Sequence, residues 1–156
     1  MKAQTHVNPW WAALTVWGVV NAVNVLQAAG FLSRVYTGSQ AINHLLGYAI
    51  LALGVPATVA LVAFVRARAE WRQWIGLVVF PAFLALMVAV DYVWVVEFRS
   101  PRRYDILVPY LLLFFGAILL MGVPMYRMER RLWLVTAATS VLLLAAMGAA
   151  MYAGVG

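Results

Sequence analysis

The chain alternates between five long apolar runs and short polar connections. The runs are 21 to 23 residues long and cover residues 9–30, 43–65, 74–96, 106–126 and 132–154. Asp91 is the one Asp, Glu, Lys or Arg inside them. Roughly 20 apolar residues in a helix cross the ~30 Å of hydrocarbon in a bilayer. The pattern therefore predicts an all-α, polytopic integral membrane protein, a bundle of five transmembrane helices with short loops.

These runs and their connections account for almost all of the 156 residues, so we expect a single transmembrane domain over residues 1–156. Charged residues make up only 10% of the chain, against roughly 25% in a typical soluble domain. We interpret residues 9–30 as a membrane helix and not a signal peptide, because the run is longer than a signal core and contains Asn21 and Asn24. The absence of cysteine excludes disulfides, thiolate metal sites and cysteine nucleophiles.

The net charge of +6 comes from basic residues in the connections between runs. Orientation in the membrane and anionic lipid headgroups explain them without nucleic acid. One side of the membrane would receive Lys2, Arg66, Arg68, Arg72, Arg127, Arg130 and Arg131. The other would receive Arg34, Arg99, Arg102 and Arg103. The positive-inside bias predicts an internal N-terminus and an external C-terminus, and we expect a prokaryotic plasma membrane.

The connections and helix surfaces carry further signals. Residues 31–42 predict a connection with a turn at 36–39 and a short interfacial segment around it. Pro56 and Pro81 predict kinks, because each proline frees a carbonyl one turn earlier. Small residues that let helices approach closely are Gly47, Gly54, Ala138, Ala145, Ala149 and Ala153. These residues serve either the internal bundle or a homo-oligomer.

Polar side chains within the spans gather toward the predicted outer side. On the first span, Asn21 and Asn24 share a face with Trp17, because positions i, i+4 and i+7 align on a helix. The other spans bring to their outer ends Asn43, His44, Tyr48, Asp91, Tyr92, Glu97, Tyr104, Asp105, Tyr110 and Tyr152. We therefore expect any activity to lie in the outer half of the bundle.

Asp91 is the most informative of these residues. It lies six positions before Glu97, about 9 Å deeper along a helix that rises 1.5 Å per residue. A carboxylate inside the membrane costs ~2.5–3.5 kcal/mol on insertion scales unless it is compensated. Arg99 or Arg102 would pair with it, or it would line a hydrated pocket with Glu97 and His44. A third alternative places Asp91 against an oligomer partner.

The first functional hypothesis is binding or transport of a small hydrophobic, amphiphilic or lipid-like ligand in this polar half. The candidate ligand-binding residues are Asn21, Asn24, His44, Tyr48, Asp91, Trp94, Arg99, Arg102 and Arg103. Apolar contacts would come from Trp17, Phe83, Met87 and Trp94. Such a mixture of apolar walls with a few converging polar groups is typical of ligand sites.

Two further hypotheses remain open. An intramembrane isomerase or transferase would use Asp91 or Glu97 as general acid or base, with His44 as the partner. An accessory structural subunit would dock onto a membrane complex through the small-residue faces. We expect no metal site, because only His44, Asp91, Glu97 and Asp105 supply ligand types and their spacing matches no metal motif.

Overall fold

The computed structural model describes residues 9–39, 41–96 and 103–154, and these residues form helices without strands. The elements are α1 (Trp10–Thr37), α2 (Ala41–Ala52), α3 (Gly54–Arg66), α4 (Trp71–Met87), a π-helical segment η1 (Val88–Val93), α5 (Tyr104–Met128) and α6 (Arg130–Tyr152). Because η1 continues α4 and α3 continues α2, the described residues give five helices long and apolar enough to cross a membrane. The prediction of five helices of membrane-spanning length is confirmed.

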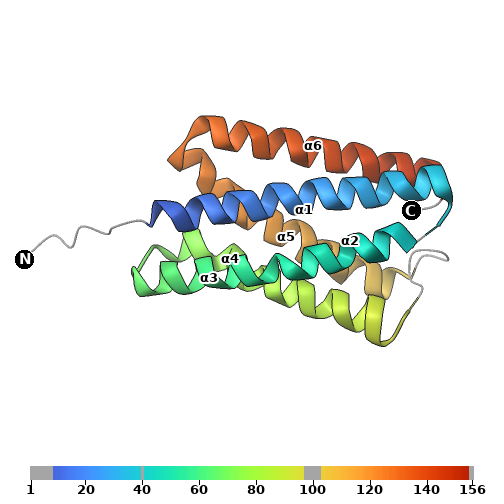
Figure 1. Ribbon diagram of the computed structural model, residues 1–156, viewed down its shortest axis with the longest axis horizontal. Coiled ribbons are helices and arrows are strands. Elements are labelled where there is room, and N and C mark those ends of the chain that lie inside the picture. Colours follow the sequence, from blue (N-terminus) through green and yellow to red (C-terminus); the bar gives the residue numbers. More distant parts are fainter. Residues whose placement is uncertain (1–8, 40, 97–102, 155–156) are drawn as a thin grey trace, which may run out of the picture.

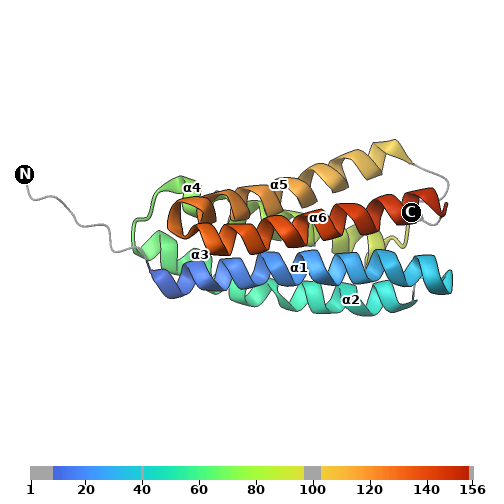
Figure 2. The same cartoon turned by 90° about the horizontal axis from the view of Figure 1, so that it is seen from above.

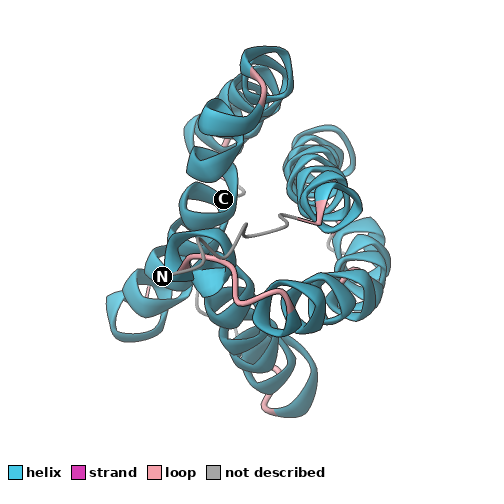
Figure 3. Cartoon of the chain, turned by 90° about the vertical axis from the view of Figure 1, so that its left-hand side faces the viewer, coloured by secondary structure: helices cyan, strands magenta, loops and turns pink. Residues whose placement is uncertain are grey.

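The helices lie side by side and alternate in direction along the chain (Figure 1, Figure 2). One end of the bundle, on the left in Figure 1, carries the start of α1, the end of α3 and the start of α6. Figure 3 looks at this end and shows helices joined by short loops. We call it the basic end, because its described residues include Arg66, Arg68, Arg72, Arg127, Arg130 and Arg131. The opposite end holds the end of α1, the start of α2, η1 and the start of α5, and we call it the Asp91 end.

The sequence predicted a connection over residues 31–42, and this extent is wrong, because α1 ends only at Thr37 and α2 already begins at Ala41. Helix α1 continues to Thr37, and Gly38 ends it with a left-handed φ of 64° while its N–H donates to the carbonyl of Arg34. Glycine adopts this conformation without steric cost. The polar residues from 33 to 37 therefore form the last turns of a long helix, and only the predicted turn at 36–39 coincides with the connection.

Two spans depart from a regular helix, and proline explains one of them. The second span breaks at Leu53, three residues before Pro56, because proline cannot donate to the carbonyl of Ala52 and its ring clashes there. The break matches the kink predicted from Pro56. In the third span, α4 continues through Pro81, and the irregularity comes later, where η1 widens into π-helical turns. The sequence pattern did not predict this segment.

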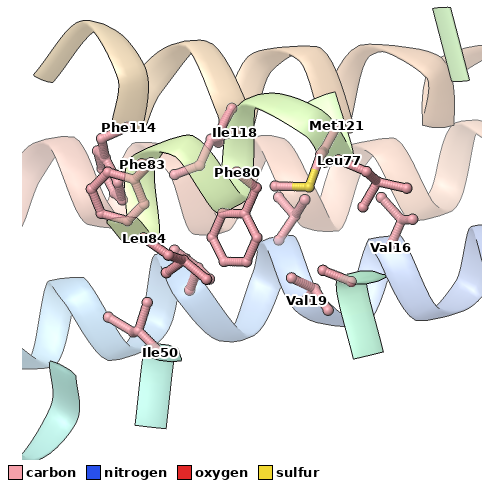
Figure 4. Packing of buried hydrophobic residues seen from close by; sticks show 14 of the residues in the cluster. Val16, Val19, Ile50, Leu77, Phe80, Phe83, Leu84, Phe114, Ile118 and Met121 are labelled. Carbon is pink, nitrogen blue, oxygen red and sulfur yellow. The ribbon is translucent and has the colours of Figure 1, made fainter. Parts of the chain in front are cut away.

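The core consists of apolar side chains from all five spans. Figure 4 shows the rings of Phe83 on α4 and Phe114 on α5 close together, with Ile50 of α2 and Val19 of α1 below them. Phe83 is fully buried, and its ring centroid lies 5.1 Å from that of Phe114 and 5.4 Å from that of Tyr110. These separations fall within the range of favourable aromatic pairs. The contacts fix the position of Tyr110.

Helices α4 and α5 approach each other closely at Gly76. A Cβ added there would lie 2.6 Å from the backbone nitrogen of Met121 and 2.7 Å from the carbonyl carbon of Leu120. Backbone atoms of a packed helix cannot move aside as a flexible side chain can. Gly76 is therefore required for the α4–α5 contact.

We expect Gly76→Ala to lower the free energy of unfolding by about 1–3 kcal/mol, the usual cost of overpacking. Gly116→Ala is the matched control, because no heavy atom lies within 4 Å of the added Cβ. Alanine favours helix over glycine by up to about 1 kcal/mol, so the control should be neutral or stabilising. Denaturation in detergent micelles measures both changes, and equal stability of the two variants would contradict the α4–α5 packing.

Candidate functional site

A small, partly enclosed cavity lies at the Asp91 end, between four of the five spans. Its volume is about 20 Å³, which is room for about one water molecule. The polar residues that line it are Gln27 from α1, Asn43 and His44 from α2, Asp91 and Tyr92 from η1, and Tyr110 from α5. The apolar part of the lining includes Leu26, Ile50 and Met87. The site is thus a polar cavity bounded by apolar side chains on its inner side.

The carboxylate of Asp91 meets the phenol of Tyr110 in this cavity. The Tyr110 hydroxyl donates a hydrogen bond of 3.2 Å to Oδ2 of Asp91, and Tyr110 itself is only 7% exposed. Asp91 lies in η1, where the N–H of Trp94 donates to the carbonyl of Ala89, five residues earlier. Short π-helical segments inside α-helices occur frequently at functional sites.

Tyr92 ties the third span to the second. Its hydroxyl donates a hydrogen bond of 3.0 Å to the carbonyl oxygen of His44, and its ring lies edge-on to the His44 ring at 5.7 Å. The hydroxyl also fills the space that a Cβ on Gly47 would need. The sequence left open whether Gly47 serves the internal bundle or a homo-oligomer. The contact with Tyr92 shows that Gly47 packs inside the bundle.

Three lining side chains have hydrogen-bonding capacity to spare. Gln27, Asn43 and His44 are half-buried, and within the described part of the chain their side chains make no hydrogen bond. The two amides each supply a donor and an acceptor, and a neutral imidazole supplies one of each. Together with the Asp91 carboxylate, the cavity can hydrogen-bond a water molecule, a hydroxyl or an amine.

Asn21 and Asn24 lie elsewhere, on the face of α1 that packs against α6. The Asn21 amide donates to Thr136 Oγ1 at 3.2 Å, and Thr139 Oγ1 donates to Asn21 Oδ1 at 2.8 Å. Asn24, fully buried, donates to the hydroxyls of Thr139 and Ser140 at 3.1 and 3.0 Å. These partners are 115 to 118 residues apart in sequence, and a nearly constant offset is what two parallel helices in fixed register produce.

Trp17 extends the same contact, because its indole N–H donates to the carbonyl of Leu132 at 3.0 Å. Polar bonds of this kind hold apolar helices together. The structure therefore shows Asn21, Asn24 and Trp17 bonded to α6 and outside the cavity lining. Their assignment to ligand binding stays a prediction.

The remaining candidates are distributed around the cavity's rim or farther away. Trp94 and Tyr48 are 66% and 59% exposed, and the Tyr48 ring lies 4.9 Å from the ring of Tyr92, tilted by 46° to it. Phe83 belongs to the core, and Met87 lines the cavity. Arg103 forms an exposed ion pair of 2.9 Å with Asp105, and such a pair contributes little to stability.

Glu97, Arg99 and Arg102 lie outside the described residues, so the predicted pairing of Asp91 with an arginine of this segment stays a prediction. Sequence reasoning missed a different arginine. Arg34, assigned to a loop, is only 3% exposed in the last turns of α1, with its guanidinium carbon 5.2 Å from the Phe31 ring centroid. The extension of the helix past residue 30 is what carries it into the packed bundle.

Part of the small-residue face on α6 points outward. Ala138, Ala145, Ala149 and Ala153 are exposed in the single chain, whereas Ala146 and Ala150 beside them are buried. The exposed alanines therefore do not build the internal bundle. Among the described residues no three His, Asp or Glu side chains lie close enough together to hold a metal ion.

Comparison with protein-family models, with curated proteins and with solved structures finds no match to this chain.

The α1–α6 contact yields a direct test of the role of Asn21. In a double-mutant cycle of Asn21→Ala with Thr139→Val, we expect a coupling free energy near ~0.6 kcal/mol and at most ~1.7 kcal/mol, as for hydrogen bonds between membrane helices. The control cycle pairs Asn21→Ala with Thr15→Val, because the Thr15 hydroxyl bonds only the carbonyl of Trp11 on its own helix. Unfolding in mixed micelles supplies the free energies, and a zero coupling for Asn21 and Thr139 would refute the interhelical bond.

Proposed function

We propose that the protein is an integral membrane protein that binds the polar head of a small amphiphilic or lipid-like molecule at the Asp91 end. The observation that carries the proposal is the convergence of polar groups from four helices on one small cavity that contains a carboxylate. Five helices of spanning length and high hydropathy support the membrane location. Leu112, Val123 and Val141 are each more than half exposed on the bundle surface, and in a bilayer they would face acyl chains.

The size of the cavity limits what enters it. A volume of about 20 Å³ admits a group comparable to one water molecule, such as a hydroxyl or an amine. The rest of an amphiphile would lie outside, against the exposed apolar surface of α2, which includes Leu45 at 68% exposure. The head group would exchange hydrogen bonds with Asp91, His44 and the amides of Gln27 and Asn43. Displacement of a water that those groups can equally bond has little net cost.

The charge distribution supports an orientation with the basic end inside. The described residues of that end include six arginines and two glutamates, whereas those of the Asp91 end include two arginines and two aspartates. The positive-inside bias then directs the Asp91 end, with its cavity, to the outer leaflet. The proposed ligand therefore reaches its site from the outer leaflet or the external solution.

An intramembrane enzyme is the second candidate, and one observation favours it. Asp91 and His44 line the same cavity, so an acid and a base would act on one bound group. A carboxylate and an imidazole are the usual partners in proton transfer. A binding protein releases its ligand unchanged, whereas an isomerase or transferase releases a product.

The test is mass spectrometry of organic molecules that co-purify with the wild type, Asp91→Asn and Asp105→Asn. The matched control Asp105→Asn removes an exposed carboxylate that pairs with Arg103 outside the cavity. We expect one amphiphile enriched with the wild type and the control, and depleted at least about tenfold with Asp91→Asn, because loss of a hydrogen bond to a charged group costs ~1.5–3 kcal/mol.

A second molecule that accumulates with Asp91→Asn, related to the first by a chemical step, would favour the enzyme, because an inactive variant retains its substrate. If no molecule is enriched with the wild type over a membrane protein purified in parallel, the binding proposal fails.

A further inference from the structure

A second concave surface lies at the basic end, between the start of α1 and the end of α3. It is an open groove of about 600 Å³. Its lining consists of Pro9, Trp11, Thr58, Val59, Val62, Ala63, Arg66 and Ala67. None of these residues belongs to the Asp91 cavity.

The groove changes from apolar to cationic along its length. Val59 and Val62 are 51% and 43% exposed, and they lie seven and four residues before Arg66 on α3. At a rise of 1.5 Å per residue, the apolar floor extends about 10 Å from the arginine toward the middle of the bundle. Trp11, 53% exposed at the start of α1, forms the opposite wall, and tryptophan favours the depth of lipid headgroups.

The charge around the mouth is positive. Arg68 lies in the short α3–α4 connection and Arg72 in the first turn of α4, and Glu70 is the one acidic residue between Arg66 and Arg72. Arg72 lies against the ring of Trp71, with its guanidinium carbon 5.8 Å from the ring centroid. Arg66 ends a helix, where the backbone carbonyls repel an anion, so the arginine side chains must supply the attraction.

We propose that this groove binds an anionic phospholipid of the inner leaflet, with the phosphate at Arg66 and an acyl chain along Val62 and Val59. The assignment rests on the membrane location proposed above and is independent of the ligand at Asp91. An apolar channel that ends in an arginine at headgroup depth matches a phospholipid in both shape and charge. A zwitterionic lipid would fill the apolar floor equally well and would gain less from the arginines.

Native mass spectrometry of the purified protein with equimolar phosphatidylglycerol and phosphatidylcholine of identical acyl chains tests the proposal. We expect the wild type to retain more phosphatidylglycerol, and Arg66→Gln to reduce that preference about fivefold, the contribution of one basic residue near an anionic lipid surface. Arg130→Gln is the matched control, because Arg130 is exposed at the same end and lies outside the groove lining.

The apolar half of the groove is tested separately. Val62→Trp should block the groove and reduce the retention of both lipids, whereas Val65→Trp, at an exposed position outside the lining, should not. Both positions are on the surface, and a thermal unfolding scan of each variant checks that it folds. Equal retention of the two lipids by the wild type, or equal losses with Arg66→Gln and Arg130→Gln, would overturn the proposal. Neither result bears on the amphiphile that co-purifies through Asp91.

Discussion

A carboxylate in an otherwise apolar helix must find compensating polar groups, and the Asp91 end is organised around that requirement. An uncompensated Asp at the centre of a membrane helix costs ~2.5–3.5 kcal/mol on insertion scales. Tyr110 donates to Asp91, and the aromatic contacts of Phe83 hold Tyr110 in place. The apolar core therefore positions the hydroxyl group that hydrogen-bonds the carboxylate of Asp91.

The polar groups of the bundle fall into two sets with different consequences. Asn21 and Asn24 are engaged by hydroxyls of α6, and these bonds fix the register of two parallel helices. Gln27, Asn43 and His44 line a water-sized cavity and retain free hydrogen-bonding capacity within the described residues. The first set therefore stabilises the helix pair, and the second can serve a ligand. The proposed lipid groove lies at the other end, where arginines outnumber acidic residues.

Much of the fold follows from the sequence because twenty-residue apolar runs admit few structures. Hydropathy predicted five helices, and Pro56 predicted the break at Leu53, since both signals are local. The end of α1 was not predicted, because polar residues at 33 to 37 read equally well as a loop or as a final helical turn. The π-helical segment at Val88–Val93 was not predicted, because hydrophobic periodicity gives no signal for a change from α-helical to π-helical turns.

The candidate site was predicted only in part, because the sequence shows which residues are polar but not which way they face. Asp91 and His44 stood out as polar residues in apolar runs, and both line the cavity. Asn21 and Asn24 stood out equally, but helix rotation turned them toward α6. Facing directions of this kind follow from how helices pack, and a single sequence gives no direct signal for them.

We expect water to reach Asp91 from the outer side of the membrane that the chain is proposed to cross five times. Because the chain has no cysteine, Asp91→Cys gives a single thiol at that depth, and a membrane-impermeant thiol reagent applied outside intact cells probes it. We expect this thiol to react readily, whereas Val141→Cys, on the exposed apolar face of α6, and Glu129→Cys, at the basic end, should stay unlabelled. Labelling of Glu129→Cys together with protection of Asp91→Cys would show that the Asp91 end does not face outward.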